Sequence, residues 1–248
     1  MTGYSPARLA ITNHLPHQDR FTPEKSKLLP AEMRDHLPLD YTTIAERLKL
    51  EAGYATAFIG KWHIYSGKDN QYAAHHQGFD INIGGCSYGG PPTFFDPYRI
   101  PFLEDRRKGE YLPDRLADET ITFMRQQVGS KKPFYVALWN YTVHWPMEAP
   151  EEFVAKWANK PKVGYNHKVY PAMLETMDLA IARVLAELKA LEIEEETFVV
   201  FTSDNGPFGG VGDARPLRGD KGHLYEGGIR VPLIVRWPGK VAAGGVSG

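Results

Sequence analysis

Short apolar segments alternate along this chain with segments whose apolar residues recur at helical spacing, and this alternation most constrains the fold. The run Phe134–Trp139 is continuously apolar and is bounded by Pro133 and Asn140, as in a strand buried on both sides of a sheet. Over residues 170–191 apolar side chains recur every three or four positions, which predicts a long amphipathic helix. Strands alternating with such helices are typical of an α/β sheet with helices on its faces.

The same patterns predict the remaining elements. Two more helices are expected over residues 40–52 and 113–127, and Gly53 stands where a C-terminal helix cap belongs. The further strands are expected at residues 54–59, 197–202 and 231–235, the first two of them buried. Three long stretches, rich in glycine, proline and charge, are predicted to be loops that either line a site or are disordered: residues 15–39, 84–109 and 208–224.

Length and charge narrow the class of protein. A chain of 248 residues suits one α/β domain, which we place at residues 1–238, with residues 239–248 as a linker or a truncated start of a further subdomain. The net charge of −1 gives no electrostatic reason to expect nucleic acid as a partner. No apolar run approaches the roughly 20 residues of a membrane helix. The single cysteine, Cys86, is interpreted as a small structural residue.

Polar side chains follow directly after three predicted strands. Lys61 and His63 follow the strand at residues 54–59, His144 follows Phe134–Trp139, and Asp204 with Asn205 follows the strand at residues 197–202. Ligands of open α/β sheets bind outside the carboxyl ends of the strands. We therefore expect these clusters to converge on one site.

The chemistry of these residues suits hydrolysis of a phosphate or sulfate ester. Asp204 and Asn205 offer the hard oxygens that Ca²⁺ or Mg²⁺ prefers, and His63 and His144 can move protons near neutral pH. Three residues offer positive charge to an anion: Arg8, Lys61 and Lys221. Each has a simpler interpretation too, because Asp-Asn-Gly is a common turn, a lysine is usually on the surface, and a histidine can be structural. Four further histidines are interpreted as incidental: His75, His76, His167 and His223.

Several segments together resemble the sulfatase family, in the family's order and over nearly the whole chain. Residues 53–63, ending in Gly60-Lys61-Trp62-His63, resemble its second signature, and Ser203-Asp204-Asn205-Gly206 resembles its metal-binding turn. Residues 217–222 followed by 225–232 resemble the segment that carries its substrate lysine. Residues 77–80 and 143–146 fit as well.

The resemblance implies an alkaline-phosphatase-like α/β fold with helices on both faces of the sheet. It also implies Ca²⁺-assisted (or Mg²⁺-assisted) cleavage of a small-molecule or carbohydrate sulfate ester. By matching position, Asp204 and Asn205 would bind the metal, and three residues would hold the sulfate or the leaving-group oxygen: Lys61, His144 and Lys221. His63 would hydrogen-bond the nucleophile and Arg8 would stabilise it. The family is often secreted or periplasmic, but residues 1–6 lack the pattern of a signal peptide and the compartment stays unknown.

The sequence departs from the family at the nucleophile. The first signature of the family reads Cys or Ser, any residue, Pro, a small residue, Arg, and this frame falls on Tyr4-Ser5-Pro6-Ala7-Arg8. The family converts its Cys or Ser into formylglycine, which is not possible at Tyr4. The central covalent step therefore has no obvious agent.

The resemblance also implies truncation at both ends, because the family's first strand ends in paired aspartates that complete the metal site, and a smaller subdomain follows at the C-terminus. The expected function is thus a sulfuric ester hydrolase by family, present as a fragment with impaired or no activity. Two alternatives stay open: a catalytically inactive relative that binds sulfated ligands, and a phosphate or phosphonate ester hydrolase of the same superfamily.

Overall fold

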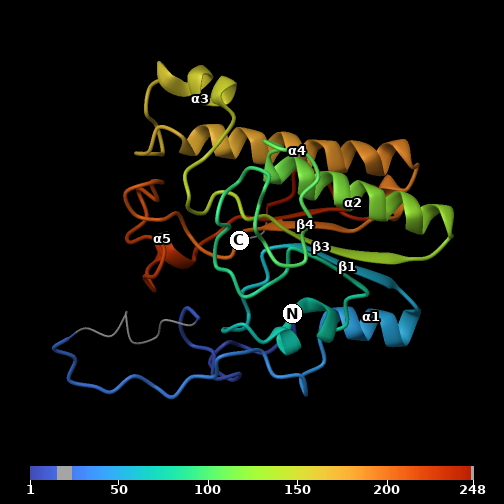
Figure 1. The fold of residues 1–248 in the computed structure, drawn as a ribbon, viewed down its shortest axis with the longest axis horizontal. Helices are drawn as coiled ribbons and strands as arrows, with labels where there is room; N and C mark the ends of the chain where they lie inside the picture. Colours follow the sequence, from blue (N-terminus) through green and yellow to red (C-terminus); the bar gives the residue numbers. More distant parts are fainter. Residues whose placement is uncertain (16–23, 247–248) are drawn as a thin grey trace. The chain divides into compact units, whose positions relative to one another are not determined.

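The computed structural model describes residues 1–15 and 24–246, and these form two compact units (Figure 1). The first unit is Met1–Pro146 and the second is Met147–Gly248. Each unit is described by itself below. The boundary predicted at residue 238 stays a prediction.

The first unit is built on a parallel three-stranded sheet with the strand order β2-β1-β3. Its strands are β1 (Ala55–Gly60), β2 (Ile81–Ile83) and β3 (Phe134–Trp139). The pairing of β1 with β3 runs from Ala55 opposite Phe134 to Gly60 opposite Trp139, so both strands end at the same edge. Residues that follow β1 and β3 therefore emerge at one end of the sheet.

Two helices cover this sheet. Helix α1 (Ile44–Ala52) packs against β1, and helix α2 (Leu112–Gly129) packs against β1 and β3; Figure 1 shows them on opposite sides of the strands. Helix α1 begins later than predicted because Thr43 and Glu46 form a capping box there, and it ends at Gly53, which adopts the left-handed conformation with φ 66°. Two short 3₁₀ helices, η2 (Asn70–Tyr72) and η3 (Ala74–His76), lie in the connection from β1 to β2.

The core of the first unit lies around Phe58 of β1. The ring of Phe58 makes edge contacts with the rings of Trp62 and Phe79, at centroid distances of 4.8 and 5.4 Å. Phe58 belongs to a hydrophobic cluster whose residues come from β1, β3, α1 and the connection from β1 to β2. Its buried members are Ala45, Phe58, Trp62, Tyr65, Ala73, Ala74, Phe79 and Ala137. Burial of this apolar surface holds the end of β1 in place.

The second unit contains helices and an antiparallel pair of strands. Helix α3 (Glu151–Ala158) packs against the long helix α4 (Tyr170–Ala190), which confirms the helix predicted over residues 170–191. Strand β4 (Val199–Thr202) pairs with β5 (Leu233–Arg236), with Val199 opposite Arg236. Two short elements, η4 (Glu194–Glu196) and α5 (Glu226–Ile229), complete the unit.

The prediction of fully buried strands is wrong for β3 and β4. Trp139 at the end of β3 is 37% exposed, and Val200 in β4 is 49% exposed. Within the described ranges each of these strands pairs on one side alone, β3 with β1 and β4 with β5, and apolar composition does not reveal how many neighbours a strand has. The strand at residues 54–59 is buried over most of its length, as predicted.

The predicted loops contain no helix or strand at residues 24–39, 84–109 and 208–224; residues 16–23 lie outside the described residues. Cys86 is buried, as expected for a structural residue. None of the helices in the described part of the chain is both long enough and apolar enough to span a bilayer.

Candidate functional site

Lys61 and His63 lie where β1 ends. The backbone N–H of Lys61 donates to the carbonyl of Trp139 at 2.8 Å, which continues the pairing of β1 with β3 by one residue. The backbone N–H of His63 donates to the carbonyl of Cys86 at 3.0 Å. His63 has a φ of 47°, a left-handed conformation that is uncommon for a histidine. These backbone bonds fix both residues relative to the sheet.

The imidazole of His63 is held in a largely buried environment. Its Nε2 lies 2.8 Å from the carbonyl oxygen of Leu15, and its ring makes an edge contact with the ring of His14 at 4.9 Å. The pKa of His63 is lowered to about 4, mainly by burial and also by the charges of Lys61, His14 and His144, against the hydrogen bond with Leu15, which raises it. Because these charges act on His63, the structure brings Lys61 and His144 near it.

Two glycines of the loop after β2 pack against these histidines. A Cβ at Gly89 would lie 2.7 Å from Cε1 of His63, and a Cβ at Gly90 would lie 2.5 Å from Nδ1 of His144. His144 Nδ1 also lies 3.0 Å from the carbonyl oxygen of Trp145. A protonated Nδ1 that donates to this carbonyl leaves Nε2 as the acceptor. The sequence reasoning missed Gly89, and the adjacent Gly-Gly pair in a long loop was the available signal.

Tyr4 and Arg8 form a separate contact at the start of the chain. The ring of Tyr4 lies at an edge contact with Tyr41, with centroids 5.3 Å apart, and the guanidinium carbon of Arg8 lies 5.8 Å from the Tyr4 centroid. Arg8 is placed by a turn in which its backbone N–H donates to the carbonyl of Ser5 at 3.0 Å. The Tyr4 side chain is 49% exposed. The tyrosine is thus accessible and sits beside the predicted stabilising arginine.

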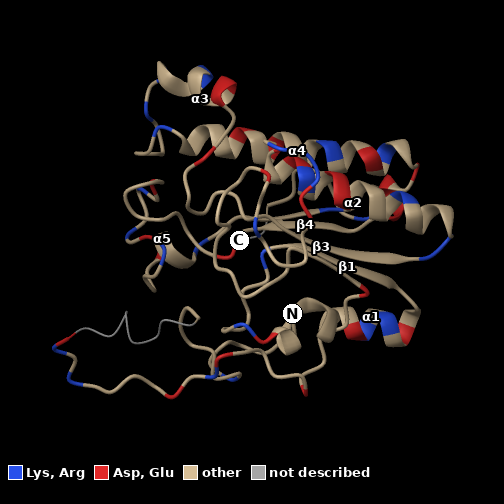
Figure 2. Ribbon diagram, viewed as in Figure 1, with Lys and Arg blue, Asp and Glu red and all other residues tan. Residues whose placement is uncertain are grey.

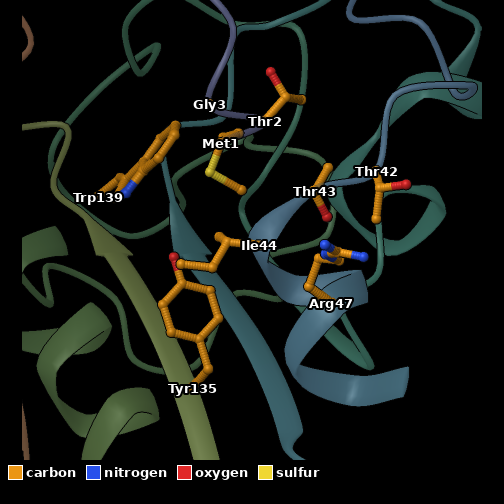
Figure 3. A pocket seen from close by; sticks show the side chains of 9 residues that line it. All are labelled: Met1, Thr2, Gly3, Thr42, Thr43, Ile44, Arg47, Tyr135 and Trp139. Carbon is orange, nitrogen blue, oxygen red and sulfur yellow. The ribbon is translucent and has the colours of Figure 1, made fainter. Parts of the chain in front are cut away.

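A pocket of about 560 Å³ lies between α1 and β3, next to this segment (Figure 3). Figure 3 shows Ile44 and Arg47 of α1 on one side and Tyr135 and Trp139 of β3 on the other. Met1, Thr2 and Gly3 also line it, together with Thr42 and Thr43. None of the predicted site residues lines this pocket.

In the second unit, Asp204 and Asn205 lie in a tight turn after β4. The Ser203 hydroxyl donates to the carbonyl of Asn205 at 2.9 Å, and the Asn205 amide donates to the carbonyl of Gly206 at 2.8 Å. The N–H of Gly206 donates to the carbonyl of Gly228 in α5 at 2.9 Å, and a Cβ at Gly206 would lie 1.9 Å from the Gly227 carbonyl oxygen. Glycine is therefore required where this turn meets α5.

Lys221 is anchored to the same turn. Its backbone N–H donates to the carbonyl of Pro207 at 2.9 Å. Nearby, a Cβ at Gly209 would lie 2.1 Å from Oδ2 of Asp220, so the two segments are closely packed. The second unit thus brings the segment of Lys221 next to the turn of Asp204 and Asn205.

The two predicted metal ligands by themselves are too few for a calcium shell. Asp204 and Asn205 supply two side chains with oxygen atoms, whereas Ca²⁺ takes six to eight oxygen ligands. The described residues contain no group of three or more His, Cys, Asp or Glu side chains that could hold a metal ion. Metal binding therefore stays a prediction, and no chemical step is assigned to a metal.

The predicted site residues divide between the two units. Lys61, His63 and His144 are grouped in the first unit, with Tyr4 and Arg8 paired at its N-terminal segment. Three lie in the second unit: Asp204, Asn205 and Lys221. That all eight share one site stays a prediction.

We expect His63 to remain neutral in the folded protein down to a pH of about 4. The unfolded chain takes up this proton near pH 6.5, so the unfolded state binds more protons between these values. The contribution of His63 to the free energy of unfolding should therefore be retained above pH 6.5 and fall by about 3 kcal/mol as the pH drops from 6.5 to 4. Imidazole NMR from pH 3 to 8, with the His63→Gln variant for assignment, measures the titration. A midpoint near 6.5 would contradict the buried environment.

Comparison with known proteins identifies the relatives of the chain. The family model named Sulfatase matches residues 1–247. The chain is 30% identical over 276 residues to the N-acetylgalactosamine-6-sulfatase of Canis lupus familiaris, covering 98% of this chain and 49% of the relative. It is 29% identical over 277 residues to human Arylsulfatase A, covering 97% of this chain and 50% of the relative. The chain spans about half the length of the curated relatives it matches.

Solved structures agree with the fold. The crystal structure of Ps i-CgsB matches with a TM-score of 0.75 and 26% identity, covering 98% of this chain and 55% of that one. A second crystal structure of Ps i-CgsB, in complex with k-i-k-neocarrahexaose, matches with a TM-score of 0.71 and 27% identity, covering 87% of this chain and 52% of that one. The likeness confirms the predicted alkaline-phosphatase-like α/β fold.

Proposed function

Because this chain belongs to the sulfatase family, we propose that it derives from a hydrolase of sulfate esters and acts on, or binds, a small-molecule or carbohydrate sulfate ester. The observation that carries the proposal is the grouping of Lys61, His63 and His144 after β1 and β3. A cation beside two imidazoles at the end of a parallel sheet suits a sulfate group. A carbohydrate ligand is supported by the relatives, one of which is named N-acetylgalactosamine-6-sulfatase and another of which was crystallised with k-i-k-neocarrahexaose.

In this proposal the site residues bind and orient the ester. Three side chains hold the sulfate or the leaving-group oxygen: Lys61, His144 and Lys221. His63 hydrogen-bonds the group at the nucleophile position, and its low pKa keeps the imidazole neutral near pH 7, so it can accept a proton. Arg8 stabilises that group, and its guanidinium already lies beside the ring of Tyr4. Asp204 and Asn205 offer oxygens to a Ca²⁺ or Mg²⁺ ion, which would supply positive charge to the sulfate.

A second candidate function is a catalytically inactive protein that binds sulfated ligands. Tyr4 favours the inactive binding protein, because a phenol cannot become formylglycine. The lysines that would bind a sulfate, Lys61 and Lys221, are nevertheless present. A phosphate or phosphonate ester hydrolase of the same superfamily is the third candidate. The sequence contexts of Lys61 and Lys221 favour sulfate over this third candidate.

Sulfate binding tests the proposed site. We expect Lys61→Ala and Lys221→Ala each to weaken binding of inorganic sulfate by about tenfold, because a charge-assisted hydrogen bond contributes roughly 1.5–3 kcal/mol. Thermal shift and NMR titration with sulfate measure the effect, and the control is Lys132→Ala, which removes an exposed lysine just before β3, at the opposite end of the sheet from Lys61. If neither Lys61→Ala nor Lys221→Ala changes sulfate binding, the two residues do not share an anion site.

Calcium binding is expected to be weak. Two oxygen-bearing side chains fill only part of a calcium shell, so calorimetry should give at best a millimolar dissociation constant, about −4 kcal/mol. Asp204→Ala should abolish even this weak binding. A micromolar dissociation constant that is lost in Asp204→Ala would mean that further ligands complete the shell.

A further inference from the structure

The second unit carries a pocket that the proposed function does not use. It has a volume of about 430 Å³ and lies where the loop after α3 meets the start of α4. Its walls are mainly apolar and aromatic, with two carboxylates, as its lining residues show: Trp157, Val163, Tyr165, Pro171, Leu174, Glu175 and Asp178. Val163 is 78% exposed and Leu174 is 38% exposed, so apolar surface around the pocket faces solvent. This volume is of the size that small-molecule sites have.

The aromatic wall of the pocket is fixed in place. The indole N–H of Trp157 donates to Oε2 of Glu175 at 2.7 Å, and the other oxygen of Glu175 forms an ion pair with Lys156. Tyr165 is 8% exposed and packs edge-on against Trp157 with centroids 6.5 Å apart. A ring that is held by a hydrogen bond and a neighbouring ring loses little conformational entropy when a ligand packs on it.

The segment that carries this wall is rich in lysine. Residues 156–168 contain four lysines and no acidic residue, in a chain of net charge −1. The ammonium of Lys160 lies 4.4 Å from the centroid of the Trp157 ring, and both Lys160 and Lys162 are exposed. Figure 2 shows the basic residues along this loop after α3 in blue. The loop thus presents positive charge at the edge of the pocket.

We propose that this pocket and its lysine loop, residues 156–168, form a second binding site for a sulfated carbohydrate chain, whose lining does not include Lys221. The class of ligand rests on the proposed function. The apolar face of a sugar ring packs against aromatic and aliphatic walls such as Trp157 and Leu174, its hydroxyls donate to carboxylates such as Asp178, and its sulfates pair with Lys160 and Lys162.

The two carboxylates in the pocket favour a carbohydrate over a nucleic acid. Hydrogen bonding from Lys156 and from Trp157 lowers the pKa of Glu175, so this carboxyl stays ionised and its charge is balanced by Lys156. Asp178 adds a second acidic group to the wall. Carboxylates repel phosphates and sulfates alike, so the part of the ligand inside the pocket must carry free hydroxyls, which can donate to these groups, while its sulfates lie outside at the lysines. A sugar ring offers such hydroxyls, whereas the backbone of a nucleic acid carries a phosphate at every nucleotide.

A fluorescently labelled sulfated carrageenan hexasaccharide is the probe, and its desulfated form is the comparison ligand. The double variant Lys160→Gln with Lys162→Gln is expected to bind the sulfated probe about tenfold more weakly than wild type, since each exposed ion pair contributes modestly. The control is Lys131→Gln with Lys132→Gln, which makes the same charge change at two exposed lysines after α2 and should leave the affinity unchanged. The indole N–H signal of Trp157 should shift on titration with the same dissociation constant.

Four results would overturn the second site: unchanged affinity of the Lys160 and Lys162 double variant, an equal loss in the Lys131 and Lys132 control, equal binding of the desulfated hexasaccharide, or equal binding of a single-stranded DNA of matched charge.

Lys221→Ala separates this inference from the proposed function. A loss with Lys221→Ala and none with the double variant leaves the proposed function standing and removes the second site. A loss with the double variant alone supports the second site and contradicts sulfate binding by Lys221.

Discussion

The purified chain is expected to give no measurable hydrolysis of an aryl sulfate. The nucleophile position is occupied by Tyr4, and a phenol cannot supply the aldehyde hydrate that the family uses to attack sulfur. Loss of a covalent nucleophile lowers kcat by roughly 10⁶-fold, which places turnover below detection. Release of a chromogenic phenol from an aryl sulfate, followed over days at high protein concentration, measures it. Turnover that disappears in Lys221→Ala would overturn this expectation.

The Tyr4→Cys variant is the matched counterpart. It restores the frame of cysteine, any residue, proline, a small residue and arginine, with Pro6 and Arg8 already in place. Since the Tyr4 side chain is 49% exposed, a maturing enzyme can reach the position. Produced in cells that form formylglycine, this variant should react with an aldehyde-specific hydrazide, and the unchanged chain should not. Labelling of the unchanged chain would place the modification at another residue.

The local elements of the fold could be predicted from sequence because their signals are local. The strand Phe134–Trp139 lies where the apolar run predicts it, and Gly53 caps α1 in the left-handed conformation, as its position after the periodic segment indicates. The apolar spacing predicts that α1 begins at residue 40, four residues before Ile44, because this spacing does not reveal the capping box of Thr43 and Glu46 at which the helix starts. The prediction that β4 is buried is wrong because the number of strands beside it is a property of the whole sheet, which a local apolar run does not reveal.

The candidate site could be predicted only in part. Lys61, His63 and His144 follow strands that pair in register, so their grouping follows from the parallel sheet. The contacts of His63 with His14 and Gly89 arise from long loops, where no periodic pattern constrains the backbone. Only the sequence resemblance predicts that Lys61, His63 and His144 of the first unit share one site with Lys221 of the second. Comparing sulfate binding in Lys61→Ala and Lys221→Ala is therefore the informative measurement.

Gly60→Ala is expected to cause the largest loss of stability among single substitutions in the first unit's sheet. Gly60 is the last residue of β1 and has a φ of 110°. It pairs with Trp139 of β3, and a Cβ at Gly60 would lie 2.0 Å from the carbonyl oxygen of Trp139. That carbonyl also accepts from the N–H of Lys61, so neither strand can move away without breaking the bond. Backbone strain and overpacking together should cost about 3–5 kcal/mol, measured by urea unfolding followed by circular dichroism.

Gly53→Ala separates strain from close approach, because Gly53 also has a positive φ, of 66°, yet no atom lies within 4 Å of its Cβ position. It should cost only about 1–2 kcal/mol, the penalty of a left-handed conformation for a residue with a side chain. Equal losses in Gly53→Ala and Gly60→Ala would mean that β1 and β3 can separate at this end. If the strands are as closely joined as the structure shows, Gly60→Ala should also displace Lys61 and weaken sulfate binding, whereas Gly53→Ala should leave sulfate binding unchanged.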